Sequence, residues 1–228
     1  MDTGPMMDFL SSLAANNSLD WMHAHKAECK AATRDFETLV GELIIRLAEH
    51  DPALLSLRPG DLTFKLNRDT RFSTDKSPYT PAFRAHISPA GKAPVPVGYF
   101  LMLTPGHSFL GGGLFASMFT DATAQVRDYI AAHGDELAQI SDKLAASGMH
   151  VDGEKLKNVP RGYDAAHPQA EYLKYKSWFL EDGVDDAIVR DGARLTDLAV
   201  ERFLLMEPFN AYLNKALTGW KMPERPSK

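Results

Sequence analysis

The chain has 228 residues, of which 44% are hydrophobic and 24% charged, and its formal net charge is -5. These fractions are ordinary for a globular protein, and the negative charge argues against general affinity for nucleic acid, which depends on neutralising phosphates. The single cysteine, Cys29, excludes an intramolecular disulfide and a cysteine-based metal cluster.

The hydropathy pattern predicts a cytoplasmic protein that does not span a membrane. No stretch approaches the ~18 consecutive apolar residues that a spanning helix requires. The N-terminal residues 1–8 contain no basic segment leading into an apolar one, so we expect no signal peptide. No linker-like or repeated segment interrupts the sequence, so we expect a single domain over residues 1–228.

The sequence contains no recognisable motif for a metal or a cofactor. The eight histidines are scattered and form no His-x-x-x-His pair. No phosphate loop, dinucleotide fingerprint or Gly-x-Ser-x-Gly elbow occurs. We therefore expect no metal and no cofactor.

Two helices are predicted in the N-terminal part. Residues 5–15 carry apolar side chains at helical spacing, and Ser18 is a suitable N-cap for a second helix from Leu19 to about His50. One row of that second helix is apolar and consists of Met22, Cys29, Phe36 and Leu43. The position of Cys29 in this row favours a packing role over a reactive one.

The middle of the chain predicts strands. Residues 62–67 are expected to form one strand, and residues 82–88, 97–104 and 107–115 a meander of three. In the segment 82–88, apolar side chains alternate with Arg84, His86 and Ser88. The triple glycine at 111–113 predicts a bulge or a close approach of another backbone segment.

Helices predominate after the meander. We predict helices over 118–133, 135–147 and 169–174, a strand over 175–181, and a helix over 195–217 in which Pro208 causes a kink or starts a new helix. The fold class is therefore α+β: an antiparallel sheet of about four to five strands packed by N- and C-terminal helices. The helix at 19–50 and the C-terminal helices should cover one face.

Two basic segments stand out in this acidic chain. Residues 65–84 carry five cationic and two anionic side chains, a net of 5 − 2 = +3, and residues 155–176 carry the same numbers, again 5 − 2 = +3. The rest of the chain must then sum to -5 − 6 = -11. If the two segments meet in the fold they form a focused positive patch, and we expect them to line one cleft.

These segments supply the candidate site residues. Arginine and lysine side chains suit phosphate and carboxylate oxygens, so we expect a small anionic metabolite as the ligand. The candidate ligand-binding residues are Arg68, Asp69, Arg71, Arg161, Tyr163, Lys174 and Lys176. The candidates for proton transfer are Asp75, Lys76 and Tyr79, because a lysine crowded by an arginine loses its proton more easily.

Each of these residues also has a structural interpretation. The charged motif is also consistent with an internal salt-bridge network in a non-catalytic interaction or scaffold domain, and ion-pair networks resemble active sites in sequence. In that interpretation Asp75 caps a turn, Lys76 is solvated, and Tyr79 and Tyr163 pack. The sequence leaves open whether the protein is an enzyme, and its oligomeric state.

The motif Arg68-Asp-x-Arg71-Phe72-x-x-Asp75-Lys76-x-x-Tyr79 resembles the signature of a bacterial family catalogued as domain of unknown function 2461. Further similar segments are Asn16-Asn17 with Trp21, Gly98-Tyr99-Phe100, Gly111-Gly112-Gly113-Leu114, Pro160-Arg161-Gly162-Tyr163 and Leu173-Lys174-x-Lys176. The resemblance covers nearly the whole chain. At Lys65 the family has an arginine, whose planar fork lysine lacks. The resemblance implies no particular activity.

Overall fold

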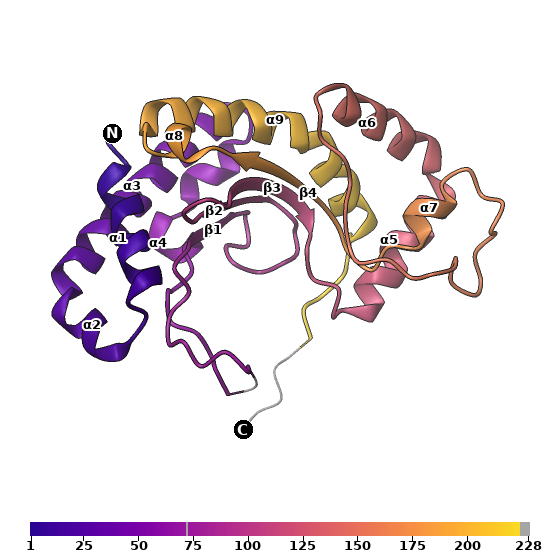
Figure 1. The fold of residues 1–228 in the computed structure, drawn as a ribbon. Coiled ribbons are helices and arrows are strands. Elements are labelled where there is room, and N and C mark those ends of the chain that lie inside the picture. The colour runs from indigo at the N-terminus through magenta and orange to yellow at the C-terminus, as the bar shows by residue number, and fades with distance from the viewer. Residues whose placement is uncertain (72, 224–228) are drawn as a thin grey trace. The chain divides into compact units, whose positions relative to one another are not determined.

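The computed structural model describes residues 1–71 and 73–223. Within these residues the chain forms an α+β fold around a four-stranded antiparallel sheet in the order β1-β2-β3-β4 (Figure 1). The strands are β1 (Phe83–Ile87), β2 (Tyr99–Leu103), β3 (Ser108–Leu114) and β4 (Trp178–Val184). The predicted fold class and the predicted meander are confirmed.

The chain divides into two compact units. Unit 1 comprises residues 1–92, 99–110 and 182–204, and unit 2 comprises residues 93–98, 111–181 and those from 205 on. Three of the boundaries between the units fall inside elements, namely β3, β4 and the last helix. No helix of the described residues is both long and apolar enough to span a membrane.

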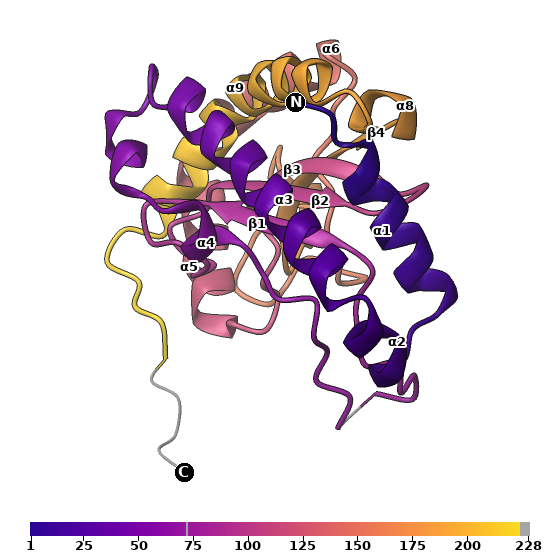
Figure 2. The ribbon, with the colours of Figure 1, turned by 90° about the vertical axis from the view of Figure 1, so that its left-hand side faces the viewer.

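Unit 1 contains the N-terminal helices. They are α1 (Gly4–Ala15), α2 (Leu19–Ala24) and α3 (Lys26–Leu47), followed by the short helices η1 (Pro52–Ser56), α4 (Pro59–Leu62) and α8 (Asp186–Val189). In Figure 2, α3 lies across β1 with α1 beside it, in agreement with the contacts of α3 with both elements. The predicted helix over 5–15 is confirmed.

The predicted helix over 19–50 is two helices, because His25 leaves the helical conformation, with φ −105° and ψ 24°. The hydroxyl of Ser18 accepts the backbone N–H of Trp21 at 3.2 Å, which confirms the predicted N-cap. The His25 ring stacks on the Trp21 ring at a centroid distance of 4.0 Å. Its Nδ1 lies 2.8 Å from the Trp21 carbonyl, so the side chain is held at the break.

The core of unit 1 lies on one face of β1. Phe36 of α3 is 1% exposed, and its ring stacks on that of Phe83 at 5.1 Å. Phe9 of α1 stacks on Phe83 from another side at 6.4 Å. Because side chains alternate along a strand, this packing directs Arg84 and His86 to the other face. The helical spacing of apolar residues in α3 and the alternation of side chains along β1 together produce this core.

The predicted strand at 62–67 is wrong. Residues 59–62 form the short helix α4, and the following residues make only isolated bridges, Thr63 with Ala85 and Asn67 with Tyr79. Beyond Phe64 the chain leaves β1 and pairs with residues 78–80 instead. Pro78 and Pro81 lack backbone N–H groups, so a continuous ladder cannot form there.

Unit 2 contains the helices α5 (Thr120–Ala132), α6 (Gly134–Ala146) and α7 (Ala170–Leu173), each close to its predicted range. Strand β4 begins three residues later than predicted, because Tyr175 bridges to Lys155 instead. The last helix, α9 (Gly192–Ala216), continues through Pro208, so no new helix starts there. The core of this unit includes Trp178 and Tyr212, which are 0% exposed.

Candidate anion-binding site

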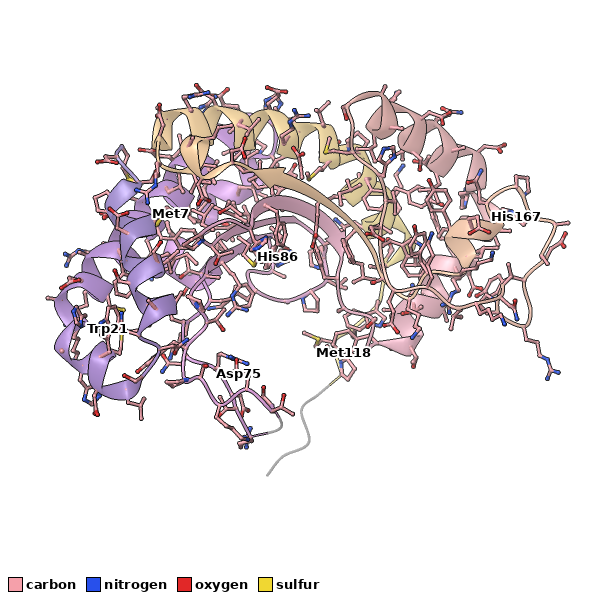
Figure 3. All side chains as sticks on the ribbon, viewed as in Figure 1. Met7, Trp21, Asp75, His86, Met118 and His167 are labelled. Carbon is pink, nitrogen blue, oxygen red and sulfur yellow. The ribbon has the colours of Figure 1, made fainter. Side chains whose placement is uncertain are left out.

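Residues 64–80, here called the arm, run out from the sheet and return. The backbone N–H of Thr80 donates to the Leu66 carbonyl at 2.7 Å, and that of Arg68 donates to the Pro78 carbonyl at 2.9 Å. Figure 3 shows Asp75 toward the outer end of the arm, whereas His86 lies in the sheet. The arm contains six of the predicted site residues. Phe72 of the family motif lies outside the described residues.

An asparagine holds the base of the arm. The side-chain amide of Asn17 donates to the Tyr79 carbonyl at 2.8 Å, and its oxygen accepts the Tyr79 N–H at 3.1 Å. The Asn17 side chain thus makes with the Tyr79 backbone the pair of hydrogen bonds that a neighbouring strand would otherwise make. The arm is therefore fixed at its base by one side chain from the α1–α2 connection.

Replacing Asn17 with Ala should destabilise the fold by about 1–3 kcal/mol, because a half-buried N–H and C=O lose their partners. Urea unfolding followed by circular dichroism measures the change. Asn16→Ala is the matched control, since the Asn16 side chain is exposed and, within the described part of the chain, bonds to the Ser12 carbonyl of its own helix. Equal effects of the two substitutions would contradict this account of the arm.

Three cations of the arm, Arg68, Arg71 and Lys76, have partners inside the arm. Arg68 pairs with Asp75, and the Nη2 of Arg71 lies 2.6 Å from an Asp69 oxygen. Lys76 donates to the carbonyl of Thr70 at 2.9 Å. This is the pattern expected of an internal network.

These contacts also fix the protonation of the two aspartates. Hydrogen bonds from Arg71 lower the pKa of Asp69 to about 2. Hydrogen bonds from Arg68 and Ser77 hold the pKa of Asp75 well below its usual range. Both carboxyl groups are therefore ionised at neutral pH, and Asp75 is a poor proton donor there.

Carbon-13 NMR titration should give a pKa of about 2 for the Asp69 carboxyl and a value near 3.8 in the Arg71→Gln variant. Because the folded-state pKa is lowered, any contribution of the pair to stability is present above pH 3.8 and disappears as the pH falls through about 2. Both side chains are largely exposed, 57% and 69%, so we expect little change in stability from Asp69→Asn. An unshifted pKa in the wild type would contradict the pairing.

The predicted residues of unit 2 lie on and after the loop 149–168. Lys174 pairs with Glu171 and Lys176 with Glu154. The Tyr163 hydroxyl donates to Asp128 at 2.8 Å, and burial together with this contact raises the pKa of Tyr163 to about 12.

Arg161 differs from these residues. It is exposed and makes no hydrogen bond or ion pair within the part of the chain that the structure describes. The roles of all these side chains, and the convergence of the two basic segments on one cleft, stay predictions.

A pocket of about 500 Å³ lies in unit 1 between helices α2 and α3 and residues 60–67. We call it the lysine pocket. Its lining residues are Met22, His23, Lys26, Cys29, Lys30, Thr33, Phe36, Glu37, Gly60, Thr63, Phe64, Lys65, Leu66, Asn67, Tyr79, Phe83 and Lys92. Tyr79 is the predicted site residue that lines it.

Five of the lining side chains are apolar or aromatic and buried, and they are Met22, Phe36, Leu66, Tyr79 and Phe83. The cationic lining residues are exposed, and they are Lys26, Lys30, Lys65 and Lys92. Glu37 is the acidic lining residue, so lysines and glutamate give a net charge of 4 − 1 = +3. The pocket thus combines apolar walls with a cationic rim.

The structure gives the rim lysines no acidic partner in residues 1–71 and 73–223. Among the described residues, no carboxylate oxygen lies within 4.0 Å of the four lysine nitrogens. Lys92 donates to the Thr63 carbonyl at 3.0 Å, which leaves its other two N–H groups. This contrasts with the arm, where the arginines are paired with carboxylates.

Sequence reasoning missed most of this pocket. Lys26 and Lys30 are spaced i, i+4 and therefore share one face of α3, which is a signal that the sequence contains. Lys65 belongs to the first basic segment, but it is not among the predicted site residues. Lys92 lies in a turn, and no pattern in the sequence connects it with α3.

Cys29 lines the same pocket and is half-buried. Burial raises the pKa of its thiol, although a hydrogen bond with Thr33 opposes this effect. The thiol is therefore mostly protonated at neutral pH and a weak nucleophile.

A family model described as "Conserved hypothetical protein (DUF2461)" matches residues 5–212. The match confirms the resemblance inferred from the sequence motif. No curated protein and no solved structure matches the chain.

Proposed function

The chain belongs to the DUF2461 family of conserved hypothetical proteins, and we propose that it binds a small organic anion in the lysine pocket. The observation that carries the proposal is the group of four lysines, without carboxylate partners in the described residues, around a pocket with apolar walls. Like charges gathered without counter-charges repel one another, and an anion relieves that repulsion. A cytoplasmic location is part of the proposal, because a single cysteine suits a reducing compartment.

The pocket's chemistry supports a particular class of ligand. Its volume of about 500 Å³ lies within the ~300–1,000 Å³ that small-molecule sites commonly have. The buried walls, with Phe36 and Phe83, suit an apolar body. The lysines suit a carboxylate or a phosphate at one end of that body.

We assign the pocket a binding role and not a catalytic one. Of the three residues predicted for proton transfer, Tyr79 lines the pocket, whereas Asp75 and Lys76 bond within the arm. Cys29 is mostly protonated at neutral pH, so it does not supply a nucleophile.

The ion pairs of the arm support a second role for the motif of residues 68–79. Arg68 with Asp75, and Arg71 with Asp69, satisfy one another inside the arm. We propose that this part of the family motif maintains the shape of the arm. This is the scaffold interpretation, applied to the arm alone, and it is compatible with ligand binding in the lysine pocket.

Calorimetric titration of the full chain with hexanoate and with hexyl phosphate tests the proposal. We expect both anions to bind, and hexyltrimethylammonium, which has the hexyl chain of hexyl phosphate and the opposite charge, to give no signal. Binding should weaken as the salt concentration rises, because the rim lysines are exposed. Equal binding of the anions and the cation would overturn the assignment.

A further inference from the structure

Arg84 lies on the face of β1 opposite to the core of unit 1. It is half-buried, and its Nε is buried without a hydrogen-bond partner among the described residues. Its Nη2 donates to the Lys65 carbonyl at 3.4 Å, which is a long contact. Side chains alternate along a strand, so Arg84 shares its face of β1 with His86, which Figure 3 labels in the sheet.

A row of phenylalanine rings crosses this face. The Arg84 guanidinium lies over the Phe64 ring, 5.5 Å from its centroid. The Phe64 ring lies 6.2 Å from that of Phe100, which in turn stacks on Phe109 at 5.9 Å. All four side chains are partly exposed. The face therefore offers flat apolar surfaces beside a cation.

Arg84 has no anionic partner among the residues that the structure describes. No carboxylate oxygen of the described residues lies within 4.0 Å of its guanidinium. Burial lowers the pKa of Arg84, which shows that its surroundings disfavour the charged form. Arginine nevertheless stays protonated at neutral pH, so the desolvation cost persists without a compensating anion. The other arginine of the first basic segment with a comparably shielded side chain, Arg68, has Asp75 as its partner.

We propose that this face is a second binding site, which takes a planar aromatic ring bearing a carboxylate. The guanidinium fork binds the carboxylate in two parallel hydrogen bonds, and the ring stacks on the phenylalanine row. We call it the ring face, defined by Phe64, Arg84, Phe100 and Phe109. Phe64 also borders the lysine pocket, but Arg84, Phe100 and Phe109 do not line it.

The experiment uses a chain in which the lysine pocket is disabled by Lys26→Glu and Lys30→Glu, so that binding of the anion there does not mask binding at the ring face. NMR titrations of this chain compare benzoate with cyclohexanecarboxylate, which has the same charge and a similar size but no aromatic ring. We expect benzoate to bind about fivefold more tightly, with shifts at residues 84, 100 and 109. Equal affinities, or shifts elsewhere, would overturn the proposal.

Substitution of Arg84 gives a second test on the same background. Arg84→Met should abolish benzoate binding, and Arg84→Lys, which keeps the charge but loses the fork, should weaken it about tenfold. Arg34→Met removes the same charge from an exposed position on α3 and should leave benzoate binding unchanged. Benzoate binding that survives Arg84→Met would overturn the proposal.

Unfolding without ligand separates a binding role from a structural one. A half-buried cation kept for a ligand costs stability in the free protein, so Arg84→Met should raise the melting temperature by about 2–4 °C. Arg34→Met should leave it unchanged. A fall in the melting temperature of the Arg84→Met variant would show that Arg84 stabilises the fold and would overturn the proposal. Since the lysine pocket is disabled in the binding tests, the failure of one site is distinguishable from the failure of the other.

Discussion

Reversing the charges of two rim lysines together, Lys26→Glu and Lys30→Glu, should weaken the binding of hexanoate and of hexyl phosphate about 100-fold. Each charge-assisted hydrogen bond to an anion contributes about 1.5–3 kcal/mol, and two new carboxylates add repulsion. Both residues are exposed and lie in the first part of α3, where negative charges interact favourably with the helix dipole. We therefore expect the variant to fold. Calorimetry measures the affinity, and the melting temperature checks the fold.

The control for this variant changes the net charge by the same amount elsewhere. Lys157→Glu with Lys221→Glu alters two exposed lysines that do not line the lysine pocket. We expect its affinity for both anions to stay within about twofold of the wild type, because exposed charges that do not contact the ligand are screened by salt. An equal loss in the two double variants would mean that only the overall charge matters, and the pocket assignment would be wrong.

Replacing Gly113 with Ala should destabilise the protein by about 3–5 kcal/mol, because two costs add. Its φ of +101° is unfavourable for a residue with a side chain, and a Cβ there would lie 2.4 Å from the Trp178 carbonyl oxygen. That oxygen belongs to backbone and cannot move aside as a flexible side chain can. Urea unfolding measures the loss, and much of the protein should be unfolded at 37 °C.

Two other glycines separate the two costs. Gly106 has a φ of +77° with open space around it, so Gly106→Ala reports backbone strain alone. Gly183 in β4 also faces open space and its φ is not positive, so Gly183→Ala should be nearly neutral. If Gly113→Ala costs no more than Gly106→Ala, close approach of the β4 backbone is not what requires a glycine at position 113.

Local patterns predicted much of the fold. The alternation of residues 82–88 correctly divides β1 into a core face with Phe83 and a second face with Arg84, because a strand has a period of two. The triple glycine correctly predicts a close backbone approach, since only glycine tolerates it. Ser18 correctly marks a helix start through its hydroxyl acceptor.

Other features depended on particular contacts that the hydropathy pattern of the sequence does not display. The break at His25 is held by stacking on Trp21, and helical periodicity continues across it. The segment 62–67 has the composition of a strand, but its partner residues near Pro78 cannot continue a ladder. The first error arises from a local side-chain contact that interrupts a helix, and the second arises where tertiary pairing overrides local propensity.

The candidate site shows the same division. The density of charge around Arg68 and Arg71 predicts a binding site for an anion. In the structure, aspartates a few positions away already balance these charges. The lysine pocket instead collects Lys26 from α3, Lys65 from the arm and Lys92 from a turn. In the arm, opposite charges a few residues apart neutralise one another. The lysines of the pocket come from separate elements that the fold brings together, and among the described residues no carboxylate pairs with them.

The most direct test of anion binding in the lysine pocket uses its own thiol. Cys29 lines the pocket and is the single cysteine of the chain, so mass spectrometry of alkylation by the neutral reagent iodoacetamide reports on one position. Saturating hexanoate should slow this reaction severalfold in the wild type and leave it unchanged in the Lys26→Glu/Lys30→Glu variant. An alkylation rate in the wild type that is the same with and without hexanoate would contradict binding of the anion in this pocket.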